Sequence, residues 1–116
     1  GALEELVNEH KVEVMKKDNL EEKEYSINNF NFKVIYTPGH TTDSVTYHFE
    51  KEKVMFTGDF LFKGTIGRTD LPTGSIADMK DSLNKIKNYS PTIKIYPGHG
   101  ESSTLKEEYE NSPYFY

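Results

Sequence analysis

The chain has 116 residues, of which 34% are hydrophobic, and it carries a formal net charge of −5. This length suits a single domain with a small core, and the acidic balance argues against a nucleic-acid partner, which needs a clustered basic face. No apolar run approaches the roughly 20 residues that cross a bilayer, so we expect no membrane partner and a cytoplasmic location.

The first half of the chain is predicted to hold most of the strands. The hydrophobic pattern predicts a helix over residues 2–9, strands over 12–15, 30–36, 43–50 and 54–57, and a charged connector over 18–24. In the 30–36 strand, the alternation places Phe30, Phe32, Val34 and Tyr36 on one face. The 43–50 and 54–57 strands follow each other across a charged turn and should form a hairpin.

The 43–50 strand shows the clearest alternation, and it decides how one histidine is interpreted. Val45, Tyr47 and Phe49 fall on the inward face, whereas His48 shares the outward face with polar neighbours. His10 closes the first predicted helix, where a partial positive charge is favourable. We therefore expect both histidines to lie at the surface without a functional role.

The second half is predicted to contain a Gly-rich loop over 60–74, a helix, a strand over 92–96 and a short helix from Thr104. Ser75 resembles a helix N-cap with Asp78 at the capping-box position, and the helix should run to about Tyr89. The predicted order is α-β-β-β-β-α-β-α. This order favours an α/β architecture with one mixed sheet covered by helices.

Three predicted strands end in the same way, with an apolar run, a glycine and a potential metal ligand. The ligands are His40 after Pro38-Gly39, Asp59 after Thr57-Gly58, and His99 after Pro97-Gly98. A lone Pro-Gly-His turn is usually only a turn. Three such turns in one sheet, however, would bring their side chains into one crevice at the strand ends. Because the chain has no cysteine, imidazole and carboxylate are its available strong metal ligands, and they suit Zn, Fe or Mn.

The motifs around these residues resemble the later metal motifs of the metallo-β-lactamase fold. They are Thr37-Pro38-Gly39-His40-Thr41, Phe56-Thr57-Gly58-Asp59 and Tyr96-Pro97-Gly98-His99-Gly100. The 64–70 loop and the 111–115 ending are similar to small hydrolases of the glyoxalase II-like (hydroxyacylglutathione hydrolase-like) branch. The resemblance implies the C-terminal half of an αββα sandwich. It also implies that His40 binds a first metal ion, His99 a second, and that Asp59 bridges them, with Zn expected and Fe or Mn as alternatives.

The family's first metal motif, HxHxDH, is absent from this sequence. We expect the chain to begin immediately after that motif, so that residues 1–116 form a single partial domain without a complete catalytic set. The two-metal site would then be incomplete, and its metal positions could be empty in this chain. The missing layer would leave apolar residues of the 30–36, 43–50 and 54–57 strands open to water. A homodimer, or association with the missing N-terminal half, would cover them.

The resemblance implies that the intact protein is a metal-dependent hydrolase that attacks a thioester or related ester, a small-molecule substrate, with a metal-bound hydroxide. In glutathione thioesterases of this fold a basic residue nine positions after the bridging aspartate binds substrate, and here that position is Arg68. Alternatively, Arg68 pairs with Asp70 and only stabilises the loop.

Other functional interpretations remain open. A mononuclear iron persulfide dioxygenase shares the loop Gly67-Arg68-Thr69-Asp70, and a nuclease of the same fold is disfavoured by the acidic charge. A non-catalytic half-domain that assembles with a partner chain is the alternative from a different class.

Overall fold

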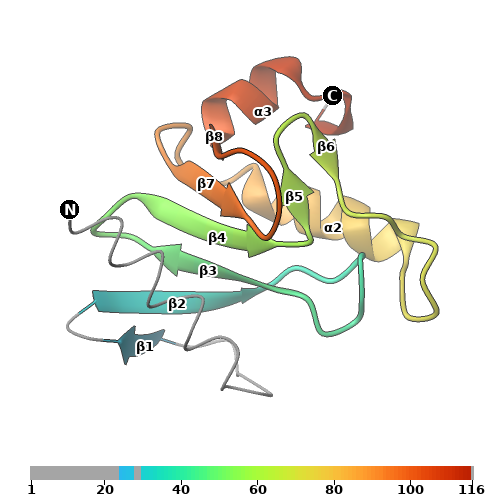
Figure 1. Cartoon of the computed structure of the whole chain (residues 1–116), viewed down its shortest axis with the longest axis horizontal. Helices are drawn as coiled ribbons and strands as arrows, with labels where there is room; N and C mark the ends of the chain where they lie inside the picture. The colour runs from blue at the N-terminus through green and yellow to red at the C-terminus, as the bar shows by residue number, and fades with distance from the viewer. Residues whose placement is uncertain (1–23, 28–29, 116) are drawn as a thin grey trace.

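The computed structural model describes residues 24–27 and 30–115, which form an α/β fold with one six-stranded sheet and one separate two-stranded hairpin (Figure 1). Its strands are β1 (Glu24–Ile27), β2 (Phe30–Tyr36), β3 (Val45–Phe49), β4 (Val54–Gly58), β5 (Leu61–Phe62), β6 (Thr65–Ile66), β7 (Lys94–Pro97) and β8 (Ser103–Thr104). Its helices are α2 (Ile76–Ile86), α3 (Leu105–Asn111) and the 3-10 turn η1 (Pro113–Phe115). The helix predicted over 2–9, the strand over 12–15 and His10 lie outside the described residues.

The large sheet has the strand order β1-β2-β3-β4-β7-β8 and is mixed, as predicted. Neighbouring strands run antiparallel except β4 and β7, which are parallel with Val54 opposite Lys94. The predicted hairpin is present as the β3–β4 pair. Since β2, β4 and β7 run in the same direction, their carboxyl ends meet at one edge of the sheet, on the right of Figure 1.

Helix α2 begins where its capping pattern predicts. The Ser75 side chain accepts a hydrogen bond from the Asp78 backbone N–H at 3.1 Å, which satisfies one of the free amides of the first turn. The helix ends at Ile86 rather than near Tyr89. Its buried side, which includes Met79, Leu83 and Ile86, packs over the sheet.

The apolar side chains form two clusters because the central strands contribute side chains to both faces. On one face, strand residues such as Ile35 and Ile95 pack with α2 and α3. On the other face, aromatic rings dominate and stack on one another, including Phe32 on Phe49 at 5.0 Å between ring centroids. The members of this second cluster are Phe32, Val34, Tyr47, Phe49, Val54 and Phe56.

The second cluster is not open to water, which corrects the expectation of a bare apolar face. Its six side chains are between 0% and 7% exposed. Aromatic stacking accounts for part of this cover, since Phe56 also packs against Phe49 and Tyr96. The oligomeric state itself stays a prediction.

Alternation assigned two residues of β3, Thr46 and His48, to an outward face that is in fact buried. His48 is 6% exposed, and its ring packs edge-on against Tyr89 at 5.2 Å, so its prediction as a surface residue is wrong. Thr46, on the same face, is fully buried. The physical reason is that both faces of β3 are covered, so polar residues on this strand do not mark a solvated side.

The predicted loop over 60–74 contains additional regular structure. Residues 61–66 form the β5–β6 hairpin, in which Leu61 pairs with Ile66 and Phe62 with Thr65. Strands β1 and β8 were also not predicted, since each is short. None of the helices within residues 24–27 and 30–115 has the length and apolar character that a membrane crossing requires.

Candidate metal centre

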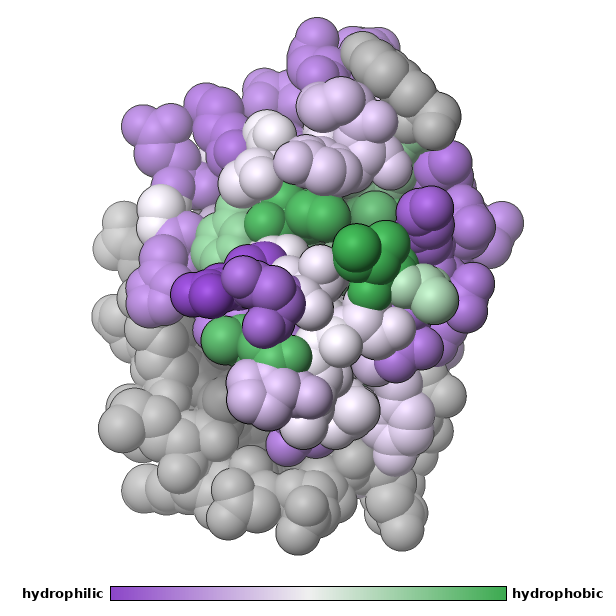
Figure 2. Space-filling model, turned by 90° about the vertical axis from the view of Figure 1, so that its right-hand side faces the viewer, coloured by the Kyte–Doolittle hydropathy of each residue, from purple (hydrophilic) through white to green (hydrophobic). Residues whose placement is uncertain are grey.

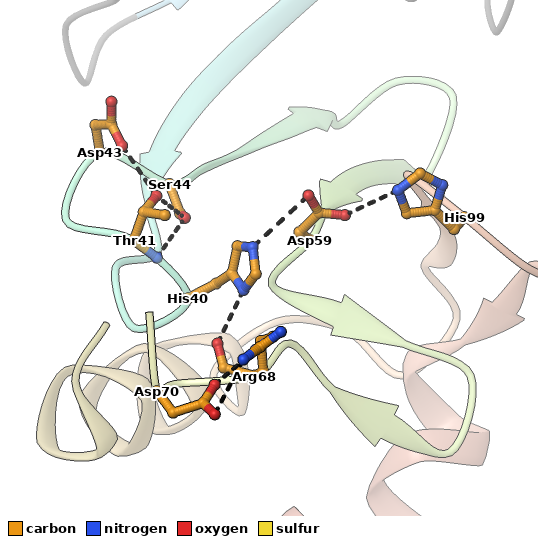
Figure 3. Close-up of polar contacts among 8 residues, drawn as sticks. All are labelled: His40, Thr41, Asp43, Ser44, Asp59, Arg68, Asp70 and His99. Atoms are coloured by element: carbon orange, nitrogen blue, oxygen red, sulfur yellow. Dashed lines mark hydrogen bonds and ion pairs between the residues drawn. The ribbon is translucent and has the colours of Figure 1, made fainter. Parts of the chain in front are cut away.

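The three strand-end residues meet at the edge where β2, β4 and β7 finish, with Asp59 between the two histidines (Figure 3). His40 Nε2 lies 3.8 Å from Asp59 Oδ2, and His99 Nε2 lies 3.6 Å from Asp59 Oδ1. Each carboxylate oxygen therefore faces a different imidazole. The residues that the sequence singled out as ligands are brought together by the fold.

The His40 imidazole is fixed by a bond to the backbone of the loop after β6. Its Nδ1 lies 2.9 Å from the carbonyl oxygen of Arg68. A carbonyl can only accept, so Nδ1 is the donor, and in the neutral imidazole Nε2 is then available to bind a metal ion beside Asp59. Metal-binding histidines in proteins are typically oriented by a hydrogen bond of this kind on the other ring nitrogen.

The turn that carries His40 is packed tightly against α2. Gly39 has φ of +145°, and a Cβ there would lie 2.6 Å from Met79 Cα, so a side chain is excluded by both backbone angle and space. Its carbonyl accepts from Ser75 N–H at 2.8 Å, and Ser82 Oγ donates to Pro38 O at 2.7 Å. The start of the helix therefore determines where the strand end leaves the sheet.

Asp59 is positioned by the parallel pair β4–β7. Gly58 adopts φ of +53° at an irregularity in the pairing, and its carbonyl accepts from Gly98 N–H at 2.8 Å. A Cβ at Gly98 would lie 3.2 Å from Asp59 Oδ1 and crowd it. Glycine at these two positions thus lets the carboxylate and the His99 backbone approach each other.

His99 is the most open of the three ligands, with 83% of its side chain exposed, compared with 17% for His40 and 45% for Asp59. Its ring lies nearly parallel to that of Phe62, at 11° and 6.5 Å between centroids. Phe62 was not singled out from the sequence. The signal that could have identified Phe62 is an aromatic residue in a predicted loop, next to polar and glycine residues.

The candidate ligands form two pairs, His40 with one Asp59 oxygen and His99 with the other. Within residues 24–27 and 30–115, no group of three His, Asp or Glu side chains is arranged to hold a metal ion. Imidazole nitrogen and carboxylate oxygen are ligands that Zn, Fe and Mn accept.

Arg68 forms the internal pair that the sequence offered as an alternative to substrate binding. Its Nε and Nη2 donate to the two carboxylate oxygens of Asp70 at 2.6 and 3.1 Å. The pair raises the pKa of Arg68 and lowers that of Asp70, in both cases mainly through the hydrogen bond. Both side chains are largely exposed, so the pair orients the loop while remaining accessible.

Gly67, next to Arg68, is a further site residue that the sequence did not single out. A Cβ on Gly67 would lie 1.8 Å from the Asp59 carbonyl oxygen and 3.1 Å from His40 Nδ1. Its N–H donates to Phe60 O at 3.1 Å. The loop therefore lies directly against two of the three candidate ligands.

Comparison with known proteins agrees with this geometry. Residues 5–99 match the model of the family described as "Metallo-beta-lactamase superfamily". A probable metallo-hydrolase from Streptococcus pyogenes serotype M6 is 40% identical over 79% of this chain and 40% of the relative. A hydroxyacylglutathione hydrolase from Haemophilus influenzae is 37% identical over 76% of this chain and 42% of the relative.

Among solved structures, the protein TTHA1623 in a di-iron-bound form is similar with a TM-score of 0.75 and 32% identity. The match covers 84% of this chain and 48% of that structure. The chain thus spans less than half the length of each of these relatives. The matched family model shows that the chain belongs to the metallo-β-lactamase superfamily, and its relatives support the glyoxalase II-like branch.

Proposed function

We propose that this sequence contributes His40, Asp59 and His99 to the two-metal site of a hydrolase that acts on a thioester or related ester. The observation that carries the proposal is the position of Asp59, whose two oxygens each face a different imidazole Nε2. A carboxylate so placed is suited to bridge two ions. The hydroxyacylglutathione hydrolase relative supports a thioester as the substrate class.

The residues of this chain would hold and orient the ions rather than react themselves. His40 is oriented by the bond between its Nδ1 and the Arg68 carbonyl, and the Nε2 of His99 approaches Asp59 from the opposite side. Bound ions of this kind polarise the substrate carbonyl and activate water, so no serine or cysteine nucleophile is needed. Viewed from the side where the strands end, apolar side chains lie beside hydrophilic ones, which suits an organic ester with a polar group (Figure 2).

Metal binding and turnover test this proposal in a protein that joins this sequence to an HxHxDH motif. We expect two Zn²⁺ per chain and hydrolysis of a glutathione thioester. Asp59→Asn should strongly lower both the Zn²⁺ content and the turnover, because a neutral amide lacks the negative charge with which a carboxylate bridges two cations. Asp81→Asn on the exposed surface of α2 is the matched control and should leave both unchanged. Unchanged turnover in Asp59→Asn would overturn the proposal.

We also propose that Arg68 binds a carboxylate of the substrate, in exchange for Asp70. The guanidinium is accessible and its bidentate geometry suits a carboxylate. Asp70→Asn weakens the internal competitor and should therefore lower KM for an anionic thioester, with little change in kcat. Arg68→Lys should raise KM. If neither variant changes KM, Arg68 serves only to hold the loop.

A mononuclear iron persulfide dioxygenase is the second candidate, supported by the resemblance of the loop Gly67-Arg68-Thr69-Asp70. The two candidates differ in metal content and in the reaction. One iron per chain with O₂ consumption would favour the dioxygenase. A non-catalytic module would show neither metal-dependent reaction.

A further inference from the structure

Glu108 is a buried carboxylate that lies on α3, away from the candidate ligands. It is 2% exposed, and both of its oxygens accept hydrogen bonds. Oε1 accepts from the Gly64 backbone N–H at 2.9 Å, and Oε2 accepts from Ser103 Oγ at 2.8 Å. Burying a carboxylate is costly unless it is well bonded, so such a residue is expected to have a specific role.

The Gly64 contact fastens the turn of the β5–β6 hairpin. Phe62 pairs with Thr65, so Lys63 and Gly64 are the two turn residues, and Gly64 has φ of +78°. The hairpin is a separate two-stranded sheet, so it lacks the neighbouring strands that hold the large sheet in place. Glu108 supplies a fixed anchor at the turn of this small element.

The same hairpin and the residues that continue it contact all three candidate ligands. Phe62 lies against the His99 ring, Gly67 lies against the Asp59 backbone, and the Arg68 carbonyl accepts from His40 Nδ1. A displacement of the hairpin would therefore change the proton position on His40 and the direction of its lone pair. The β5–β6 hairpin and the residues after it therefore connect Glu108 with the three candidate ligands.

We propose that Glu108 is a positioning residue, which holds the β5–β6 hairpin so that the Arg68 carbonyl keeps His40 in the Nδ1–H tautomer that binds metal. This inference rests on the proposed metal site. It goes beyond that proposal by assigning the orientation of His40 to a carboxylate on another element. Loss of such orienting partners typically lowers metal affinity by about 10- to 100-fold.

The test uses this chain and measures the imidazole directly. Long-range ¹⁵N NMR of His40, without metal and above the ordinary imidazole pKa of about 6.5, reports which nitrogen carries the proton. We expect the Nδ1–H form in the wild type and in Glu108→Gln, whose amide oxygen can still accept from Gly64. Glu108→Ala should give a mixture of tautomers and about tenfold weaker Co²⁺ binding.

Ser103→Ala separates positioning from stability. It removes one bond of Glu108 but leaves the Gly64 contact, so it should lower the unfolding midpoint while His40 stays in the Nδ1–H form. If Glu108→Ala does not fold, Glu108→Asp tests the same point, because the shorter side chain withdraws from Gly64 while keeping its charge. The proposal is overturned if the folded Ala or Asp variant keeps the wild-type tautomer, or if Ser103→Ala shifts it equally. If the wild-type chain binds no Co²⁺, the tautomer alone decides the role of Glu108, while the proposed function is judged separately in the protein that also carries the HxHxDH motif.

Discussion

Asp59 faces two imidazoles at once, and this determines how the isolated chain should bind metal. A catalytic zinc ion usually has three protein ligands, whereas the three candidate ligands here would be divided between two proposed positions. We expect weak Zn²⁺ binding, with a Kd above about 1 μM, in isothermal titration of this chain. His40→Ala and His99→Ala should each remove only part of the residual binding. Sub-micromolar binding that His40→Ala abolishes would contradict this division.

His48 should make the stability of the chain depend on pH. Burial lowers its pKa, since the charged ring would lose its hydration, while the Glu50 charge opposes this and Lys33 adds to it. The unfolded state, with a pKa of about 6.5, therefore takes up a proton before the native state does. The contribution of neutral His48 to the free energy of unfolding is therefore complete above the unfolded-state pKa, and it is lost as the pH falls below that pKa.

Urea unfolding at several pH values measures this effect. We expect His48→Phe, which keeps an aromatic ring against Tyr89, to flatten the fall in unfolding free energy below pH of about 6.5. Because other groups titrate in this range, the quantity to compare is the difference between wild type and variant. An identical pH dependence in the two proteins would show that the pKa of His48 does not differ between the native and unfolded states.

The residue scale also shows what sequence reasoning can reach. The proximity of His40, Asp59 and His99 could be predicted because each follows an apolar strand and a glycine, which is a local pattern. His48 was misjudged because its environment depends on Tyr89, which lies on a different element. Glu108 was missed because a glutamate in a charged helix is usually exposed. Glu108 has helical spacing from Leu105 and Ser112, which are both buried, so these three residues share one face of the helix. That spacing was the signal in the sequence that Glu108 is buried.

At the scale of elements, the N-cap of α2 connects helix stability to the His40 turn. Ser75 accepts from Asp78 N–H through its side chain, and its own N–H donates to the Gly39 carbonyl. Ser75→Ala removes the side-chain bond and should lower the free energy of unfolding by about 1 kcal/mol. Ser75→Asp keeps an acceptor and should stay close to the wild type. Denaturant titration of the three proteins measures both values, and an equal loss in the two variants would mean that the cap is not the cause.

Long elements were easier to predict than short ones. Strands β2, β3 and β4 and helix α2 each carry enough periodic residues to be recognised, and the predicted cap at Ser75 is confirmed. The two-residue strands β5, β6 and β8 are too short to show the alternation of apolar and polar residues that predicts a strand. They exist because tertiary contacts hold them, such as the bond from Gly64 N–H to Glu108. The part of the site built on them could therefore not be predicted.

For the molecule as a whole, we expect no hydrolase activity from this chain alone. The sequence contains His40, Asp59 and His99 but lacks the HxHxDH ligands that the family resemblance implies. Thioester hydrolysis with excess Zn²⁺ should stay at the metal-only background rate, and Asp59→Asn should match the wild type. Turnover at rates typical of enzymes, on the order of 1–10³ s⁻¹, would show that three ligands suffice.

Self-association remains a prediction that needs measurement. The six aromatic and aliphatic side chains of the second cluster are buried, so they give no drive to associate through that face. Within residues 24–27 and 30–115, β1 is the edge strand next to β2, and an edge can pair with a second copy. We expect light scattering to show a concentration-dependent increase above the 13.4 kDa of one chain. A constant mass of one chain across concentrations would contradict homodimer formation.

The parallel pairing of β4 with β7 also has a kinetic consequence. Val54 lies opposite Lys94, so the contact that brings Asp59 near His99 closes a loop that contains the β5–β6 hairpin and all of α2. Closing such a loop is entropically costly, and non-local strand pairing slows folding. The β3–β4 hairpin, by contrast, needs only a short turn. The two ligand-bearing ends should therefore meet late in folding, after the local hairpins and α2 have formed. In a refolding experiment, the environment of His99 would report completion of the native topology rather than the first collapse of the chain.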